Sequence, residues 1–498
     1  MATHRGDFLA HIQFLGAAGT VTGSKHLISL ASPGSARDEL QLLVDCGLFQ
    51  GKKEWRERNW QSLPLEAGKI RGVILTHAHL DHCGWIPRLV KQGFRGPIYA
   101  TPPTIDLCRI LLPDSGHLQE EDAAFHNKRK SSRHHPALPL YTAKEAEACL
   151  KYFQPVTFEK CERVSAEVSF RLVRAAHILG SAMAEITLAT NSTGRPFRML
   201  FTGDIGRVRE SRFAPGKVVG SGPQTGETAD LVVMESTYGN RQHPTEDPRQ
   251  PLGELITETA RRGGSVVVPA FAVERTQKFL FLVKELIESG QAPRIPVYCD
   301  SPMAIQAVEI FLQHGEEYSD ATKQLINRYG SPLEWEGFRF AESAAESKKI
   351  NDAKFPTIII SSSGMVTGGR IQHHLARCLP DPRNTVVFIG FQAPGTRGFT
   401  IKSGAPEVKI FGEMIPIRAQ ISTFEQFSDH ADTPELLSWL RSFRAQPATT
   451  YLVHGEPDAA SELRDSMVKQ LGWDVRIAEW MEKVELDLSS VTGSRGGW

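Results

Sequence analysis

Four potential metal ligands lie within six residues of this sequence, in the run THAHLDH at residues 76–82. The run follows Val73-Ile74-Leu75, an apolar segment that predicts a buried strand. Residues two apart on an extended segment point to the same side, so His77 and His79 can bind one ion, and a turn lets Asp81 and His82 bind a second. These ligands favour zinc, with manganese and iron(II) as open alternatives. The other interpretation is a histidine-rich surface loop.

Three further residues follow apolar segments in the same way. They are His177 after Ala175-Ala176, Asp204 after Phe201-Thr202-Gly203, and His454 after Leu452-Val453. A single histidine or aspartate at a strand end is more often a cap or a turn residue. Taken together with the first run, however, these three residues favour one shared metal centre.

The composition limits the class of protein. A chain of 498 residues is longer than one hydrophobic core usually organises, so we expect at least two domains. Lys plus Arg equals Asp plus Glu at 57 each, so any polyanion must be attracted by a local patch or by metal ions. Seven cysteines without a CxxC pair favour a reducing cytoplasm. The short apolar run at residues 8–15 predicts neither export nor membrane anchoring.

The pattern of apolar residues predicts an inserted domain. Short apolar runs and glycine-rich turns dominate up to about Asn240, and they predict two packed sheets. The polar segment 117–135 predicts an inserted surface helix and loop. Beyond Asn240, helical stretches alternate with fully apolar strands, which is typical of a parallel sheet between helices. We therefore predict a first domain at 1–239, an inserted α/β domain at 240–427, and completion of the first domain by 428–498.

The run His-x-His-x-Asp-His at residues 77–82 is followed along the chain by His177, Asp204 and His454. This order of ligands resembles the dinuclear centre of the metallo-β-lactamase fold. The resemblance implies an αββα sandwich with two Zn²⁺ ions per chain. It places His77, His79 and His177 on one zinc, Asp81, His82 and His454 on the other, and Asp204 between them. Asp45, which follows the strand Leu43-Val44, would orient a ligand imidazole or would simply be a turn residue.

Three further segments resemble motifs A, B and C of the β-CASP nucleases, the family of the mRNA 3′-end processing endonuclease and its bacterial and archaeal relatives. They are MESTYG around Glu235, FSDHAD around His430 and VHGE around His454. In this family a histidine in motif C accompanies RNA-directed members, so His454 favours RNA as the partner. The RNA would enter the active site as a single strand, because a duplex is too wide to present one phosphate deeply. Asp429 in motif B departs from the family pattern, which has a small residue there.

The resemblance implies a hydrolytic mechanism. Two metals would activate a bridging hydroxide, with Asp81 among the catalytic residues as well as the ligands. His430 would protonate the leaving 3′-oxygen while Glu235 orients its imidazole. The active site would then lie in the cleft between the domains. Because the chain lacks the C-terminal extension of the exonucleolytic relatives, we expect endonucleolytic cutting.

Residues of the inserted domain are candidates for RNA binding. Ser363 and Gly364 lie in a glycine-rich turn that can direct backbone N–H groups at a phosphate. Arg275, Arg370 and Arg397 lie beside such turns and could pair with the RNA backbone, although structural roles are equally open. His373 and His374 lack a strand-end context, so we expect both on the surface. The alternatives to a ribonuclease are a DNA or dual-specificity nuclease and a catalytically silent RNA-processing scaffold, and a homodimer is left open.

Overall fold

The structure is a computed structural model that describes residues 9–31, 39–64, 66–129, 135–190, 195–207, 229–331, 335–352, 355–390, 392 and 395–488. These residues form two compact units. The first comprises 9–207, 229–242 and 430–488, and the second comprises 243–429. The chain thus leaves the first unit after residue 242 and returns to it at residue 430. The sequence analysis predicted these two boundaries at residues 240 and 428. Each unit is described by itself.

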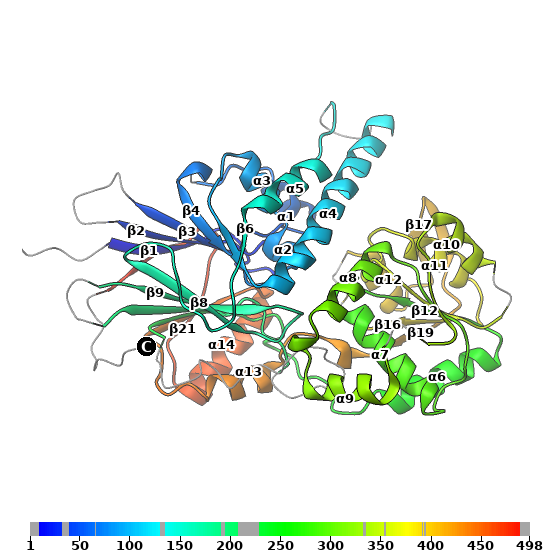
Figure 1. Cartoon of the computed structure of the whole chain (residues 1–498). Coiled ribbons are helices and arrows are strands. Elements are labelled where there is room, and N and C mark those ends of the chain that lie inside the picture. Colours follow the sequence, from blue (N-terminus) through cyan, green and yellow to red (C-terminus); the bar gives the residue numbers. More distant parts are fainter. Residues whose placement is uncertain are drawn as a thin grey trace, which may run out of the picture. The chain divides into compact units, whose positions relative to one another are not determined.

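Two seven-stranded sheets build the first unit (Figure 1). The first sheet has the order β22-β1-β2-β3-β4-β5-β6, with β1 (Leu9–Phe14), β2 (His26–Ala31), β3 (Leu40–Val44), β4 (Ile70–Ile74), β5 (Ile98–Ala100), β6 (Phe153–Pro155) and β22 (Lys483–Leu486). The second has the order β21-β20-β11-β10-β9-β8-β7, with β7 (Glu162–Arg163), β8 (Val168–Arg174), β9 (Ala182–Leu188), β10 (Phe197–Phe201), β11 (Leu231–Glu235), β20 (Thr449–Val453) and β21 (Val475–Ile477). Strands from the C-terminal segment therefore complete both sheets.

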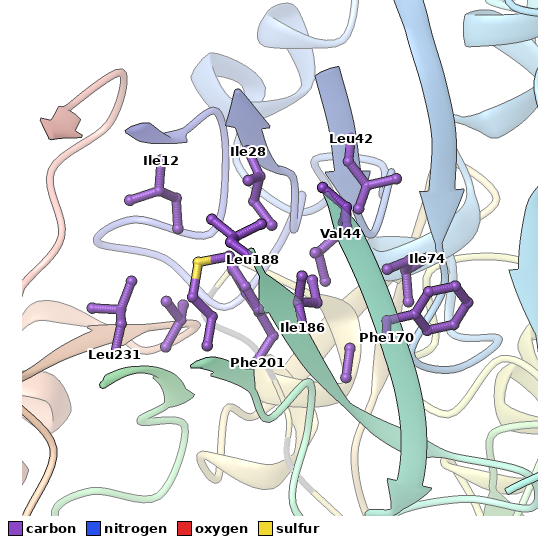
Figure 2. Packing of buried hydrophobic residues seen from close by; sticks show 14 of the residues in the cluster. Ile12, Ile28, Leu42, Val44, Ile74, Phe170, Ile186, Leu188, Phe201 and Leu231 are labelled. Carbon is purple, nitrogen blue, oxygen red and sulfur yellow. The ribbon is translucent and has the colours of Figure 1, made fainter. Parts of the chain in front are cut away.

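The main core of this unit lies between the two sheets. In β8, Val168, Phe170 and Leu172 are buried and alternate with partly exposed neighbours, the pattern of a strand with one face on a core. Figure 2 shows Phe170 in the same cluster as side chains of the first sheet, among them Ile28 and Ile74. Each large aliphatic side chain buried in this way contributes about 1.5–3 kcal/mol to folding.

Helices cover the outer faces of these sheets (Figure 1). On the second sheet, α13 (Thr433–Leu440) and α14 (Pro457–Leu471) contribute Leu436, Leu463 and Met467 to a separate core. The predicted αββα sandwich is confirmed. The segment 117–135 is not an insertion of its own, because residues 117–129 form the second half of one long helix. The remaining helices are α1 (Lys53–Arg58), α2 (Leu80–Cys83), α3 (Ile86–Lys91), α4 (Pro102–Arg129) and α5 (Ala143–Cys149).

The second unit contains a six-stranded sheet of order β14-β13-β15-β12-β16-β19 in which every neighbouring pair is parallel. Its strands are β12 (Val266–Pro269), β13 (Val297–Cys299), β14 (Phe338–Phe340), β15 (Ile358–Ser361), β16 (Thr385–Phe388) and β19 (Gln420–Thr423), and a separate hairpin joins β17 (Glu407–Ile410) to β18 (Glu413–Pro416). All four residues of β15 are buried, as expected for a strand covered on both faces. The helices are α6 (Arg249–Arg261), α7 (Arg275–Glu288), α8 (Pro302–Gln313), α9 (Asp320–Tyr329), α10 (Ala344–Asn351), α11 (Ile371–Cys378) and α12 (Arg397–Lys402).

Hydrophobic clusters include residues of both faces of this parallel sheet. Val268 and Ile360 belong to one cluster, and their strand neighbours Val267 and Ile359 belong to another. Successive residues of a strand point to opposite faces, so the two clusters lie on opposite sides of the sheet. In the part of the chain that the structure describes, no helix is both long enough and apolar enough to cross a membrane.

Candidate metal centre

All seven predicted metal ligands lie in the first unit, and their side chains converge. His77 and His79 follow β4, while Asp81 and His82 lie in the one-turn helix α2. His177, Asp204 and His454 follow β8, β10 and β20 respectively. The sequence places all of them after strands, and the two sheets bring those strand ends together.

The first group of ligands contains His77, His79, His177 and Asp204. His79 Nδ1 lies 3.1 Å from His77 Nε2 and 3.2 Å from His177 Nε2. Asp204 Oδ2 lies 3.6 Å from His77 Nε2 and 3.5 Å from His177 Nε2. Three imidazole nitrogens and one carboxylate oxygen therefore surround a single point.

The second group contains Asp81, His82 and His454. His454 Nε2 lies 3.2 Å from His82 Nε2 and 3.3 Å from Asp81 Oδ2. The other oxygen of Asp204, Oδ1, lies 3.3 Å from His82 Nε2. Asp204 thus presents one oxygen to each group.

Contacts at Nδ1 fix which nitrogen of three ligand histidines faces the centre. His82 Nδ1 lies 2.8 Å from Asp45 Oδ2, so Nδ1 carries a proton and Nε2 is the nitrogen directed at the other ligands. The Thr237 hydroxyl donates its proton to the backbone oxygen of His454. The hydroxyl oxygen of Thr237 can therefore accept a hydrogen bond from His454 Nδ1, which lies 3.0 Å away. The Thr76 hydroxyl donates to Asp45 and can accept from His77 Nδ1 in the same way.

This arrangement fits a bound cation. His82 Nε2 and His454 Nε2 face each other across 3.2 Å, a contact that needs either a proton or a metal cation between the two nitrogens. Ligand atoms about 2.0–2.1 Å from a tetrahedral zinc are about 3.3 Å apart, the spacing found in both groups. The donor set of imidazoles and carboxylates therefore supports a divalent metal.

The electrostatics of the centre agree with this conclusion. Burial raises the pKa of Asp204, but His454 and His82 outweigh burial and hold this pKa well below its usual value. Burial lowers the pKa of His77 well below normal. Burial also lowers the pKa of His82, but the carboxylates of Asp204 and Asp45 outweigh it and hold the pKa well above normal. Ionised carboxylates are ready to bind a metal, and a cation can take the place of the extra proton that the raised pKa keeps on His82.

Backbone conformations at these strand ends are unusual. Asp45, Ala176 and His454 have positive φ angles of 59°, 54° and 49°, a region that residues other than glycine rarely adopt. Each such residue costs on the order of 1–3 kcal/mol and persists only where the surroundings enforce it. The His454 backbone is held by its N–H, which donates to Ala17 O at 2.6 Å. Strain of this kind is typical of functional sites.

Glu235 and His430 lie beside the ligands. Glu235 ends β11 and is fully buried, with the backbone N–H of Ile205 donating to Oε1. His430 Nδ1 lies 3.0 Å from Glu235 Oε2 and 3.2 Å from Oε1, so the imidazole donates to this carboxylate. His430 Nε2 then lies 4.0 Å from Asp204 Oδ2. The nitrogen opposite Glu235 is therefore directed toward the metal ligands.

The predicted RNA-contacting arginines belong to the second unit and make contacts within it. Arg370 pairs with the buried Asp300 at 2.7 Å and also donates to two backbone oxygens. Arg397 donates to the backbone oxygen of Lys409 at 2.8 Å, and Arg275 lies 3.5 Å from Asp429 Oδ2. RNA contact by these three arginines stays a prediction.

The glycine-rich turn of the second unit is tightly packed. The Ser363 hydroxyl accepts from the backbone N–H of Thr367 at 2.9 Å. A Cβ on Gly364 would lie 2.5 Å from the Phe271 ring, so close packing explains glycine there. Phosphate binding by Ser363 and Gly364 stays a prediction.

One feature of the second unit differs from the sequence expectations. His374 is fully buried and lies 2.6 Å from Asp300, so the surface position expected for it was wrong, whereas His373 is exposed as expected. Asp429 pairs with the buried amine of Lys278, so its charge is compensated. The sequence also gave no signal for Thr76 and Thr237, since threonines are common at strand ends.

Comparisons with known proteins agree with this geometry. Models of three domain families match the chain: the metallo-beta-lactamase superfamily at residues 37–102, the Beta-Casp domain at 276–401, and the Zn-dependent metallo-hydrolase RNA specificity domain at 414–478. Ribonuclease TTHA0252 of Thermus thermophilus is 35% identical over 470 residues, which cover 94% of this chain and 98% of that protein. Transcription termination factor FttA of Methanocaldococcus jannaschii is 30% identical over 472 residues, covering 93% of this chain and 69% of that protein.

A solved structure shares the fold. The crystal structure of a protein of unknown function from Enterococcus faecalis aligns with a TM-score of 0.51 at 13% identity and covers 96% of this chain and 100% of that one. Identity this low supports the fold alone. Family membership rests on the curated relatives and on the three domain matches. The chain belongs to the β-CASP family of the metallo-β-lactamase superfamily and is a metal-dependent hydrolase.

Proposed function

We propose that this protein is a zinc-dependent ribonuclease that hydrolyses phosphodiester bonds within single-stranded RNA. The match to an RNA specificity domain and the ribonuclease name of a relative that aligns over nearly its whole length support RNA as substrate. His454 supports the same assignment, because motif C carries histidine in RNA-directed members of the family. The proposal includes endonucleolytic cutting, in the cytoplasm.

The proposed cofactor is a pair of zinc ions. His77, His79 and His177 would hold one ion, and Asp81, His82 and His454 the other. The two oxygens of Asp204, one near each group, support its assignment as the bridge. When bound, the two ions supply a water of lowered pKa and neutralise charge on the phosphate.

The pairing of Glu235 with His430 carries the proposal, because it supplies a proton donor beside the ligands. Glu235 accepts a hydrogen bond from His430 Nδ1–H, and an adjacent carboxylate is the kind of partner that stabilises an imidazolium. The proton on Nε2 then faces the centre and would pass to the departing 3′-oxygen, leaving a 5′-phosphate on the other product. General-acid catalysis of this kind contributes about 10²–10⁴-fold to a rate.

Two variants test the roles separately. We expect His430→Ala to retain zinc and to lose about 100-fold or more of the RNA cleavage rate, whereas Asp81→Ala should lose zinc itself. His373→Ala, at an exposed histidine of the second unit, is the matched control and should behave as wild type. Full RNase activity in a zinc-replete His430→Ala protein would refute the proton-donor role.

The substrate assay uses end-labelled RNA with a 5′-monophosphate or a 5′-triphosphate, alongside single-stranded DNA of the same sequence. Internal RNA fragments are the expected products. Mononucleotides released from the 5′ end would overturn the endonucleolytic assignment, and equal cutting of DNA would establish dual specificity. Stoichiometric zinc binding without cleavage of either polymer would favour a catalytically silent scaffold.

A further inference from the structure

Two tryptophans of the first unit stand out by their exposure. Among the residues that the structure describes, Trp60 and Trp480 are the exposed tryptophans, at 52% and 39%. Each has an arginine near its ring: the Arg88 guanidinium carbon is 5.9 Å from the Trp60 ring centre, and that of Arg58 is 3.9 Å from Trp480. Arg58 also lies 4.2 Å from the ring of Trp55. We call these five residues the Trp–Arg platform.

The platform is fixed to the interior by Asn59, which is buried. Its side-chain amide donates to Phe49 O at 2.7 Å and accepts from Phe49 N at 2.9 Å, so both backbone groups of Phe49 are engaged. Its backbone oxygen accepts from the Trp85 indole at 3.0 Å. The neighbours of Asn59 on either side, Arg58 and Trp60, are therefore presented by a rigid segment. A ligand that binds them does not have to order a mobile loop first.

The platform belongs to the same strand ends as the metal ligands. The segment carrying Trp55 to Trp60 follows β3 and Asp45, and the intervening loop bonds to α2, with Cys46 N donating to His82 O at 2.7 Å. Trp480 follows β21, the neighbour of β20, whose end carries His454. A polymer held at the platform would therefore run along the edge of the sheets where the metal centre lies.

The charge around the platform favours a polyanion. Residues 52–60 carry four basic side chains and two acidic ones, in a chain whose overall charge is zero. Lys52, Lys53 and Arg56 are exposed. On the Trp480 side, Glu479 and Glu482 contribute negative charge, so the positive excess lies toward α1. Exposed aromatic rings beside basic groups are the means by which proteins bind single-stranded nucleic acid without reading its sequence.

We propose that the Trp–Arg platform binds bases of single-stranded RNA by stacking, outside the metal centre, and so determines substrate affinity. This inference rests on the proposed ribonuclease function. Trp60 and Trp480 supply the stacking faces, and the basic residues of segment 52–60 contact phosphates. The platform therefore lowers KM for RNA and leaves the chemical step unchanged.

The test compares Trp60→Ala and Trp480→Ala with wild type in the zinc-loaded full chain. The substrates are a fluorogenic single-stranded RNA of about twelve nucleotides and bis(p-nitrophenyl) phosphate, a diester without bases. We expect each variant to raise KM for RNA about 5-fold or more at unchanged kcat, because removing a stacking side chain weakens binding uniformly. Turnover of the small diester should stay at the wild-type level.

Phe125→Ala is the matched control, because Phe125 is 49% exposed and carries Arg129 at 4.5 Å from its ring. It should leave both substrates unaffected. Trp480→Phe keeps a ring and should restore most of the RNA affinity. If Trp480 only fastens its turn to α1, Trp480→Ala will lower the Tm without changing KM, and that result would overturn the proposal.

An unchanged KM in Trp60→Ala and Trp480→Ala, with wild type cleaving RNA normally, also rejects the platform. By contrast, wild type that turns over the small diester but not RNA rejects the proposed ribonuclease function itself. The two failures are therefore distinguishable in the same set of measurements.

Discussion

Replacing Asp45 by asparagine tests how the centre is pre-organised. The buried carboxylate accepts from Thr76 N at 2.8 Å, from the Thr76 hydroxyl at 2.9 Å and from His82 Nδ1 at 2.8 Å. In Asp45→Asn the new NH₂ group faces either the His82 proton or the Thr76 backbone N–H, because the amide has only one acceptor oxygen. If His82 loses its acceptor, its proton can move to Nε2, the atom that would bind metal.

Loss of such an orienting partner costs about 10- to 100-fold in metal affinity, which corresponds to about 1.4–2.7 kcal/mol. We expect a zinc dissociation constant raised by that factor, measured by competition with a chromogenic chelator. Thr142→Ala is the control, because it removes the capping box of α5 in the same unit and should lower stability by about 1 kcal/mol at unchanged zinc affinity. Wild-type zinc affinity in a folded Asp45→Asn protein would refute the reasoning.

Two other predictions concern stability. Gly47→Ala would place a Cβ 1.7 Å from the backbone oxygen of Asp81, so we expect a lower Tm together with weaker zinc binding, and an unchanged Tm would contradict this packing. Lys25 is buried, and burial lowers its pKa to about 8 in the folded protein. At pH values between this folded pKa and the higher pKa of the unfolded chain, the unfolded chain holds more protons than the folded one. As pH rises from 8 to above 10, the free energy of unfolding of wild type should therefore increase by up to about 3 kcal/mol relative to that of Lys25→Met. A difference between the two proteins that does not change with pH in denaturant titrations would contradict this prediction.

The sequence predicted the fold and the convergence of the ligands because both follow from local patterns. Fully apolar strands indicate a parallel sheet, and polar residues directly after strands meet at a sheet edge. The partners of His374 and Arg370 could not be predicted in this way. Both contact Asp300, at least seventy residues earlier in the chain, and no local pattern links residues so far apart. The orienting threonines were missed for a related reason, since their role depends on which imidazole lies beside them.

The pairing of C-terminal strands with both sheets has a consequence for synthesis on the ribosome. His454 follows β20, which lies between β11 and β21, and the ligand before it in the chain, Asp204, is made 250 residues earlier. At about 5–20 residues per second, roughly 12–50 s separate the two. For most of that time the nascent chain holds six of the seven ligands but lacks both His430 and His454. Until residue 454 has been made, a chain still attached to its own messenger RNA therefore has an incomplete centre.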